Sequence, residues 1–333
     1  IGGPAMLRSA AKNHQFVTVI TDTNDYDELI AEIEKNKGST TLEFRKKLAA
    51  KTFSTTAYYD SLISNWFYQD RNEEVGKFSA AGKLSSTLRY GENPHQSASL
   101  YKSSMQNSGI PQATLLQGKE LSYNNINDAD AALQLIKEFE KARPTVAIIK
   151  HANPCGVASG STLQEAYTKA LSCDTTSAFG GIIALNQTID KDSAEQIVKI
   201  FTEVIIAPGI TDEAKAIFKT KNNLRVLILT SLHEKNNSQN FKSIEGGILV
   251  QSNDDESTDK SDLKVVTEKK PSDIEIEDML FAFKVCKHVK SNAIIYVKNK
   301  KTIGIGAGQM SRVDSAKIAS QKNSEMEKSE ENS

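Results

Sequence analysis

The chain has 333 residues, with 41 Lys and Arg against 42 Asp and Glu and a net charge of −1. This balance excludes a broad basic field for nucleic acid or an anionic membrane, and no apolar run approaches the roughly 18 residues of a membrane span. Three scattered cysteines exclude a disulfide framework and a zinc site of four thiolates. Because no signal peptide pattern is visible, we expect a cytoplasmic protein of about two domains.

The first 80 residues alternate helical and strand patterns. Apolar residues recur at helical spacing over residues 5–13, 26–36 and 42–66, the last as one helix or two, and residues 17–20 predict a short strand. No period survives in the polar residues that follow, 69–83, which predict a linker. We therefore expect a boundary near residue 80 and two domains, 1–80 and 81–333.

Strand and helix patterns alternate again beyond this boundary. Strands are predicted at 146–149, 182–185, 204–207, 225–229, 248–250 and 294–297. Helices are predicted at 162–171, 193–201, 212–219 and 273–290. The alternation is typical of a layered α/β sheet. Residues 153–156 are predicted as a turn, 252–261 as a solvated loop, and 320–333 as disordered because they hold almost no apolar residue.

Residues suited to ligand binding gather in five segments near predicted strand ends, the edge of an open α/β sheet where ligands bind. The segments are 88–96, 150–156, 177–181 with 203–209, 290–293 and 304–312. In the first segment, Arg89 suits a phosphate and Tyr90 a flat ring. A polar turn with Arg89 in a surface ion pair fits the composition equally well.

Lys150 and His151 end the predicted strand 146–149. A Lys beside a His could keep the imidazole neutral and able to accept a proton near pH 7. For an isolated pair the structural alternative, a core His with a Lys that reaches the surface, is the better interpretation. Cys155 resembles a small buried apolar residue more than a nucleophile, because no separate base lies at a recognisable spacing.

Three further sequence features could bind a ligand. Two of them also have a purely structural interpretation, and the third does not match its motif. The paired glycines Gly180 and Gly181 allow a ligand to approach the backbone, or form a bulge. Asn292 precedes a predicted strand and could orient a carbonyl or carboxamide, or cap a turn. The G-x-G-x-G pattern at 304–308 lacks the third glycine of the dinucleotide fingerprint, so we exclude a dinucleotide site.

The segments 88–96, 150–156, 178–185, 204–209 and 304–312 resemble one family in the same order over almost the whole chain. These are the bifunctional enzymes of purine synthesis that combine phosphoribosylaminoimidazolecarboxamide (AICAR) formyltransferase with IMP cyclohydrolase. The resemblance implies that 1–80 is the C-terminal part of a methylglyoxal-synthase-like cyclohydrolase domain. It implies that 81–333 is a C-terminally incomplete transformylase domain of cytidine-deaminase-like α/β layers. It further implies a homodimer without a catalytic metal.

The resemblance also implies roles for single residues. His151 would be the general base that takes a proton from the 5-amino group of AICAR as the amine attacks the formyl carbon of 10-formyltetrahydrofolate, which gives FAICAR and tetrahydrofolate. Lys150 would stabilise the oxyanion, and Asn292 would lie beside the reacting amine and carboxamide. The implied nucleotide contacts are Arg89, Tyr90, Gly180, Glu203 and Arg312, with Val313 on the folate side. Glu203 stands where some relatives have Asp.

In the cyclohydrolase part, Lys12 resembles the proton-transfer lysine, and Ile1 a backbone contact, for the closure of FAICAR to IMP. The family continues before Ile1 and well beyond Arg312, so we expect a piece truncated at both ends in which Lys12 is a surface cation. Two other hypotheses stay open. The first is a catalytically silent nucleotide-binding or dimerisation module, which would bind AICAR without formyl transfer. The second is a deaminase-like zinc hydrolase, which the missing ligand spacing disfavours.

Overall fold

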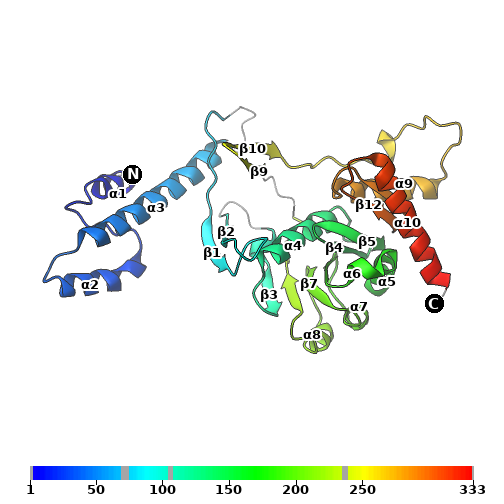
Figure 1. Ribbon diagram of the computed structural model, residues 1–333, viewed down its shortest axis with the longest axis horizontal. Coiled ribbons are helices and arrows are strands. Elements are labelled where there is room, and N and C mark those ends of the chain that lie inside the picture. Colours follow the sequence, from blue (N-terminus) through cyan, green and yellow to red (C-terminus); the bar gives the residue numbers. More distant parts are fainter. Residues whose placement is uncertain (1–2, 69–74, 104–107, 235–238, 332–333) are drawn as a thin grey trace. The chain divides into compact units, whose positions relative to one another are not determined.

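The computed structural model describes residues 3–68, 75–103, 108–234 and 239–331. The chain divides into two compact units, residues 1–83 with 101–105 and residues 84–100 with 106–333. Figure 1 shows the elements of both units in chain order. Within the described ranges, no helix combines the length and the apolar character that a membrane span needs.

The first unit is helical. Its elements are α1 (Gly3–Lys12), the 3-10 helix η1 (Thr23–Asp25), α2 (Tyr26–Lys35) and α3 (Leu42–Tyr68). Helix α3 is continuous over 27 residues, whereas residues 17–20, which were predicted as a strand, have no regular structure. Arg45 of α3 donates to the carbonyl of His14 at 2.8 Å and to that of Gln15 at 2.7 Å. The backbone carbonyls just before residue 17 are therefore bound by a side chain and not by a neighbouring strand.

The second unit is built on an eight-stranded mixed sheet in the order β11-β12-β5-β4-β6-β7-β8-β3. Its strands are β3 (Thr114–Gln117), β4 (Thr145–Lys150), β5 (Asn153–Ser159), β6 (Gly181–Leu185), β7 (Thr202–Ala207), β8 (Arg225–Ile228), β11 (Ile294–Lys298) and β12 (Lys301–Gly306). Strands β6, β7 and β8 are parallel, and the other neighbouring pairs are antiparallel. There are also two small sheets of two strands each: β1 (Lys83–Leu88) pairs with β2 (Ala98–Lys102), and β9 (Gln239–Ile244) pairs antiparallel with β10 (Gly247–Ser252).

Helices cover both faces of the large sheet. They are α4 (Tyr123–Ile136), α5 (Leu163–Cys173), α6 (Thr175–Ala178), α7 (Lys191–Ile197), α8 (Asp212–Phe218), α9 (Asp273–Lys287) and α10 (Arg312–Glu331). The unit also contains the 3-10 helices η2 (Ile110–Gln112) and η3 (Lys260–Asp262). Ala147 and Ile149 of β4 face a core that includes α4 and α9. Val146 and Ile148 face the core of α5, α7 and α8. Because successive residues of one strand are buried on opposite faces, the predicted layered α/β fold is confirmed.

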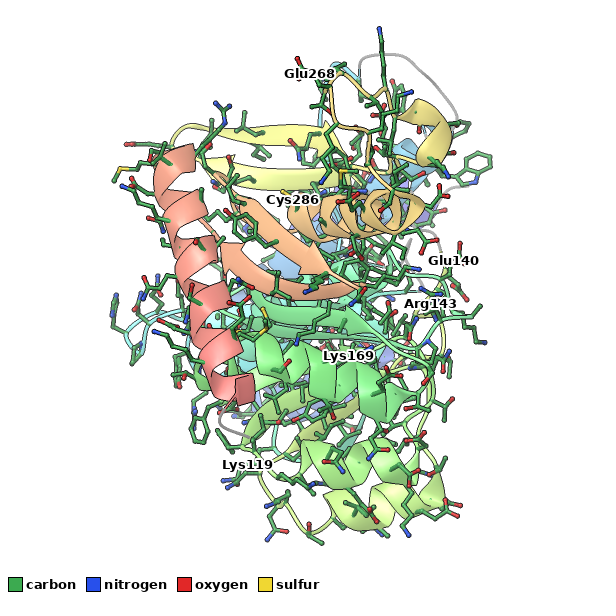
Figure 2. All side chains as sticks on the ribbon, turned by 90° about the vertical axis from the view of Figure 1, so that its right-hand side faces the viewer. Lys119, Glu140, Arg143, Lys169, Glu268 and Cys286 are labelled. Atoms are coloured by element: carbon green, nitrogen blue, oxygen red, sulfur yellow. The ribbon has the colours of Figure 1, made fainter. Side chains whose placement is uncertain are left out.

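Helix α10 occupies the segment 320–333 as far as Glu331, so the prediction of disorder there was wrong. The helix packs along β12 (Figure 2). A Cβ added to Gly304 would lie 2.1 Å from the carbonyl oxygen of Ala319, and one added to Gly306 would lie 1.9 Å from that of Ser315. The contact is made by backbone and small residues, which explains why a search for large apolar side chains missed it.

The hairpin between β4 and β5 turns at His151 and Ala152, not at the predicted 153–156. These two residues have φ angles of 50° and 56°, as in the two-residue turns that match the twist of paired strands. The register of the hairpin then shifts, so that Cys155 is the extra residue of a bulge next to Pro154. A bulge tolerates a proline that a regular ladder excludes, and the signal for a turn at this place was therefore misleading.

Candidate functional site

Two opposite edges of the eight-stranded sheet are distinguished by the hairpins that turn there. The His151 edge is the end of the sheet at which β4 turns into β5. Because β4 and β6 are antiparallel and β6, β7 and β8 are parallel, the last three strands all begin at this edge. Strand β12 ends there, since it runs antiparallel to β5. The Lys300 edge is the opposite end, at which β11 turns into β12 at Asn299 and Lys300.

Most of the predicted site residues of the second unit lie at the His151 edge. They are Lys150 and His151 at the end of β4, Gly180 before β6, Glu203 near the start of β7, Asn292 before β11, and Arg312 with Val313 at the start of α10. Gly180 and Glu203 lie at strand starts, although the prediction placed ligand groups at carboxyl ends, because β4 and β6 run in opposite directions. Residues 207–209, from the same predicted segment as Glu203, lie at the Lys300 edge.

Lys150 extends toward the start of β6. Its ammonium donates to the carbonyl oxygen of Phe179, and a Cβ added to Gly180 would lie 3.6 Å from its Nζ. Gly180 has a φ of 68°, a conformation that favours glycine, and donates to the carbonyl of Phe201 at 2.8 Å. The Phe179 and Phe201 rings are 5.5 Å apart and 59% and 43% exposed. A cation, a bare stretch of backbone and two accessible rings thus lie side by side.

His151 presents an exposed side chain at the tip of the hairpin. Its backbone N–H donates to Oδ2 of Asp128 in α4 at 3.2 Å, and its carbonyl accepts from Nδ2 of Asn153 at 3.1 Å. Oδ1 of Asn153 accepts from the backbone N–H of Lys290 at 3.1 Å. The backbone of His151 is therefore attached both to α4 and to the loop that precedes β11.

Asn292 is held by the segment that follows β12. Its Nδ2 donates to the carbonyls of Gln309 and Met310, each at 3.0 Å, and its own carbonyl accepts from Oγ of Ser315 at 2.7 Å. Both N–H bonds of the side-chain amide are therefore used within the protein. The group that Asn292 can offer a ligand is its Oδ1, which accepts hydrogen bonds only.

Arg89 and Tyr90 follow β1 and lie against each other. Nη2 of Arg89 is 3.2 Å from the hydroxyl of Tyr90, and its guanidinium carbon lies 4.9 Å from the centre of the Tyr90 ring. Nδ2 of Asn124, at the start of α4, donates to the carbonyl of Glu92 at 3.3 Å. The loop that carries Arg89 and Tyr90 is thereby attached, through Glu92, to the same helix whose Asp128 holds the His151 backbone.

Glu203 has a partner that the sequence did not reveal. Nη1 of Arg225 lies 2.8 Å from Oε2 of Glu203, with the side chains 16% and 35% exposed. Arg225 begins β8 and pairs with Val204 of the parallel strand β7. The only signal in the sequence was a charged residue at the start of an apolar strand. Arg225 binds one carboxylate oxygen of Glu203 and so fixes the orientation of this carboxylate. A ligand at Glu203 would therefore meet a carboxylate of fixed orientation.

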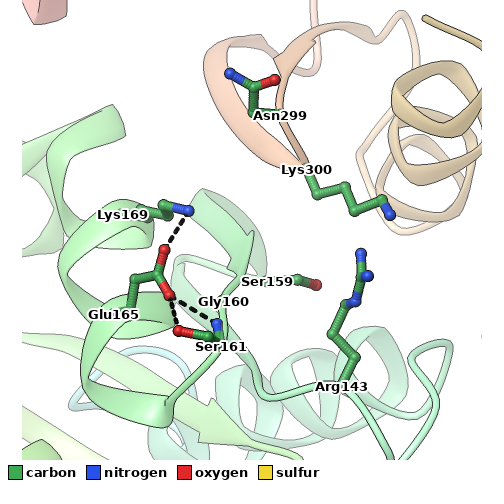
Figure 3. A pocket seen from close by; sticks show the side chains of 8 residues that line it. All are labelled: Arg143, Ser159, Gly160, Ser161, Glu165, Lys169, Asn299 and Lys300. Atoms are coloured by element: carbon green, nitrogen blue, oxygen red, sulfur yellow. Dashed lines mark hydrogen bonds and ion pairs between the residues drawn. The ribbon is translucent and has the colours of Figure 1, made fainter. Parts of the chain in front are cut away.

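A separate pocket lies at the Lys300 edge (Figure 3). Its volume is about 340 Å³, and it is lined by Arg143, Ser159, Gly160, Ser161, Glu165, Lys169, Asn299 and Lys300. Hydrogen bonds from Lys169 and Ser161 lower the pKa of Glu165 to about 2, so this carboxylate is already bound within the protein. Strand β5 has seven residues and separates the pocket from the His151 edge by about 20 Å.

The remaining predicted residues lie elsewhere. Lys12 is exposed at the end of α1 in the first unit, and Ile1 lies outside the described residues. Burial raises the pKa of the Cys155 thiol to about 12, as expected for a small buried apolar residue. In the part of the chain that the structure describes, no three side chains of His, Cys, Asp or Glu come together in a way that could hold a metal ion.

Comparison with known proteins identifies relatives for nearly the whole chain. A sequence model of the AICARFT/IMPCHase bienzyme family matches residues 10–322. The bifunctional purine biosynthesis protein PurH of Brucella anthropi is 59% identical over 325 residues, which are 97% of this chain and 60% of that protein. The protein of the same name from Brucella abortus is 58% identical with the same coverage. The chain thus spans about 60% of the length of the curated relatives that it matches.

Proposed function

Since the chain belongs to the AICARFT/IMPCHase bienzyme family, we propose that its second unit carries the site of formyl transfer from 10-formyltetrahydrofolate to AICAR. The observation that carries this proposal is the convergence of Lys150, His151 and Asn292 at one edge of the sheet. Asn153 joins two of their segments through a hydrogen bond to Lys290, 137 residues along the chain. Separate polar loops have no structural need to meet in this way, whereas a reaction that joins two substrates does.

In the proposed reaction, His151 acts as general base. The 5-amino group of AICAR is a weak nucleophile because its lone pair is conjugated with the ring and carboxamide. As the amine nitrogen forms its bond to the formyl carbon, the exposed imidazole takes a proton, a contribution of about 10²–10⁴-fold to the rate. The bond between the formyl carbon and the folate nitrogen then breaks. The same proton is available to that nitrogen, so that FAICAR and tetrahydrofolate leave.

Lys150 and Asn292 complete the reacting centre in this proposal. The Lys150 ammonium lies beside the bare backbone of Gly180, where a formyl oxygen can approach and its developing negative charge is stabilised. Since both N–H bonds of the Asn292 amide are used by the protein, its Oδ1 accepts from the amine or the carboxamide of AICAR. This acceptor would orient the nucleophile toward His151.

The nucleotide would be bound by Arg89, Tyr90, Gly180, Glu203 and Arg312. The exposed guanidinium of Arg89 suits the phosphate, and the Tyr90 ring suits the flat base. Val313, which is 62% exposed, would lie on the folate side, and the accessible Phe179 and Phe201 rings lie at the same edge of the sheet. These apolar groups fit the flat ring system of 10-formyltetrahydrofolate, which is a co-substrate and requires no metal in this scheme.

We assign residues 1–80 to the cyclohydrolase part of the family and residues 81–333 to the transformylase part. In the whole protein, Lys12 and Ile1 would contribute to the closure of FAICAR to IMP. The working form would be a cytoplasmic homodimer. Support for the dimer comes from β9 and β10, which are exposed throughout. Leu249 of β10 is 58% exposed, and Val266, in the segment before α9, is 84% exposed, as at surfaces that bind another chain.

The proposal is tested by formyl transfer. The purified chain is mixed with AICAR and 10-formyltetrahydrofolate, tetrahydrofolate is followed as it forms, and His151→Ala serves as the control. Turnover that this substitution abolishes supports the assignment. A folded chain that binds AICAR in calorimetry without transfer would instead indicate the silent nucleotide-binding module. Sedimentation of the parent chain and of Leu249→Asp tests the dimer separately.

A further inference from the structure

The backbone at His151 adopts a conformation that its sequence does not favour. His151 and Ala152 both have positive φ, 50° and 56°, in a two-residue turn for which Asn-Gly is the preferred sequence. A residue other than glycine costs roughly 1–2 kcal/mol in this conformation. Neither residue is a glycine, so other contacts must hold the turn.

Two side chains supply those contacts, one at each backbone group of His151. Asp128 accepts from the His151 N–H at 3.2 Å, and Asn153 donates to the His151 carbonyl at 3.1 Å. Asp128 belongs to α4, which is packed into the core through its buried residues, such as Leu133. The N–H bond direction and the carbonyl direction of one residue fix its φ and ψ, and therefore the direction of its Cβ.

We infer that Asp128 and Asn153 are positioning residues that hold the His151 imidazole in its reactive direction and set its separation from Asn292. This inference rests on the proposed function of His151 as general base. Neither residue touches the reacting atoms; each acts through the backbone of the hairpin tip.

Asn153 sets the separation between His151 and Asn292, because both the nitrogen and the oxygen of its side-chain amide form hydrogen bonds. While Nδ2 binds the His151 carbonyl, Oδ1 accepts from the Lys290 N–H at 3.1 Å. The Lys290 carbonyl in turn accepts from the Gly308 N–H at 2.7 Å, and the following residues, 309 and 310, bind Asn292. One side chain thus links the base to the amide that orients its target.

The chain offers a matched control at the Lys300 edge. Asn299 and Lys300 form a turn of the same kind, with φ angles of 53° and 55°. Asp278 of α9 accepts from both of their N–H groups at 2.7 Å. Asp278→Ala therefore removes an equivalent contact from a tip that carries no reactive group.

The test measures kcat and KM together with the state of His151 itself. The variants are Asp128→Ala, Asn153→Ala and the conservative Asp128→Asn, which keeps an acceptor oxygen. We expect kcat to fall at least about ten-fold in both alanine variants with KM for AICAR changed less than about three-fold. Asp128→Asn should recover most of the activity, and Asp278→Ala should leave kcat unchanged.

Nuclear magnetic resonance provides a readout that needs no turnover. The chain has five histidines, so the imidazole signal of His151 is assigned by its loss in His151→Ala. We expect this signal to shift in both alanine variants, and the exchange of the His151 amide to accelerate about ten-fold or more in Asp128→Ala. Neither change should appear in Asp278→Ala.

An unchanged His151 signal and unchanged amide exchange in the alanine variants would overturn the inference. If the parent chain transfers no formyl group, the proposed function fails, and the resonance measurements still decide whether Asp128 and Asn153 position His151. If the alanine variants do not fold, Asn153→Asp decides: it keeps the acceptor for Lys290, removes the donor to His151 and places a negative charge against the His151 carbonyl. An unshifted imidazole signal in that variant would then contradict the inference.

Discussion

Two hairpins of one sheet turn with the same backbone geometry at opposite edges, and only one of them holds a residue of the proposed formyl-transfer site. The Lys300 edge places Asn299 first in its turn, a residue that tolerates positive φ. The His151 edge places His151 and Ala152 in the same conformation. Alanine has no intrinsic preference for positive φ, so the His151 turn is held by contacts with other residues and not by the conformational preferences of its own sequence.

The two tips also differ in how a helix holds them. At the Lys300 edge, one carboxylate, that of Asp278 in α9, binds both N–H groups of the turn. At the His151 edge, Asp128 binds one N–H, and Asn153 joins the tip to a distant loop. One helix therefore suffices for the Lys300 turn, whereas the His151 turn is attached both to α4 and to the loop before β11, as its proposed role in positioning a side chain requires.

The largest effect is expected from a substitution that removes the proposed general base and keeps the conformation of the turn. His151→Asn deletes the imidazole and introduces a residue that tolerates positive φ, so formyl transfer should fall by about 10²–10⁴-fold. The free energy of unfolding should change by less than about 0.5 kcal/mol. Single-turnover kinetics and urea unfolding measure the two quantities. The reverse exchange, Asn299→His, should leave transfer intact, and equal losses in both variants would contradict the difference between the tips.

The next effect concerns stability alone. Asp278→Ala removes a carboxylate that accepts two hydrogen bonds of 2.7 Å, and we expect the free energy of unfolding to fall by about 2 kcal/mol. Asp278→Asn keeps an acceptor and should lose less. Urea unfolding of both variants beside the parent provides the measurement. A neutral Asp278→Ala would show that the Lys300 turn does not depend on its helix.

A smaller effect measures the strain at the His151 edge. Ala152→Gly should raise the free energy of unfolding by about 0.5–1 kcal/mol, because glycine adopts positive φ without steric conflict and only part of this gain is offset by its greater freedom in the unfolded chain. Asn299→Gly should have almost no effect, since Asn already tolerates the conformation. Thermal unfolding of the two variants compares them, and equal changes would mean that the two tips are equally strained.

The smallest expected effect is on the pH dependence of stability, and it compares one carboxylate near each edge of the sheet. Burial raises the pKa of Asp174, but its ion pair with Lys322 and hydrogen bonds from Ser177 outweigh burial and hold that pKa below its ordinary value. The resulting stability is present above the unfolded pKa, about 4, and is lost as the pH falls through the folded pKa. We expect a loss of about 1 kcal/mol or less between pH 5 and pH 2.

Substitution tests this pH dependence. Asp174→Asn should flatten part of the fall in the free energy of unfolding below pH 4, as measured by urea titrations at several pH values. Glu165→Gln at the Lys300 edge should flatten it less, because its side chain is 39% exposed whereas that of Asp174 is 12% exposed. A larger effect at Glu165 would reverse this ranking of the two edges.

The sequence located the segments that meet at the His151 edge but not what holds them there. Lys150, His151 and Asn292 were visible because polar residues at the ends of apolar strands stand out. Asp128 was not, since it lies 23 residues from His151 on a helix that was not predicted. Asn153 was assigned to the wrong turn, because a Pro and a Gly nearby gave a stronger turn signal than His-Ala.

The sequence also did not indicate which neighbouring strands are parallel and which are antiparallel. An apolar run predicts a buried strand, and nothing in it states whether the neighbouring strand is parallel. Gly180 and Glu203 therefore lie at the His151 edge at the starts of strands, and Arg225 lies beside them at the start of β8. The G-x-G pattern was visible, but its cause was the close approach of α10, whose polar sequence gave no sign of packing.

This close approach determines which changes α10 tolerates. Its contact with β12 is made at Ser315 and Ala319, one helical turn apart, where the backbone meets Gly304 and Gly306. Ser315 is fixed a second time by its hydrogen bond to Asn292. Mutations on the solvent side of the helix can therefore accumulate with little consequence, whereas a single added methylene at position 319 would lift the helix and move Arg312 at its start.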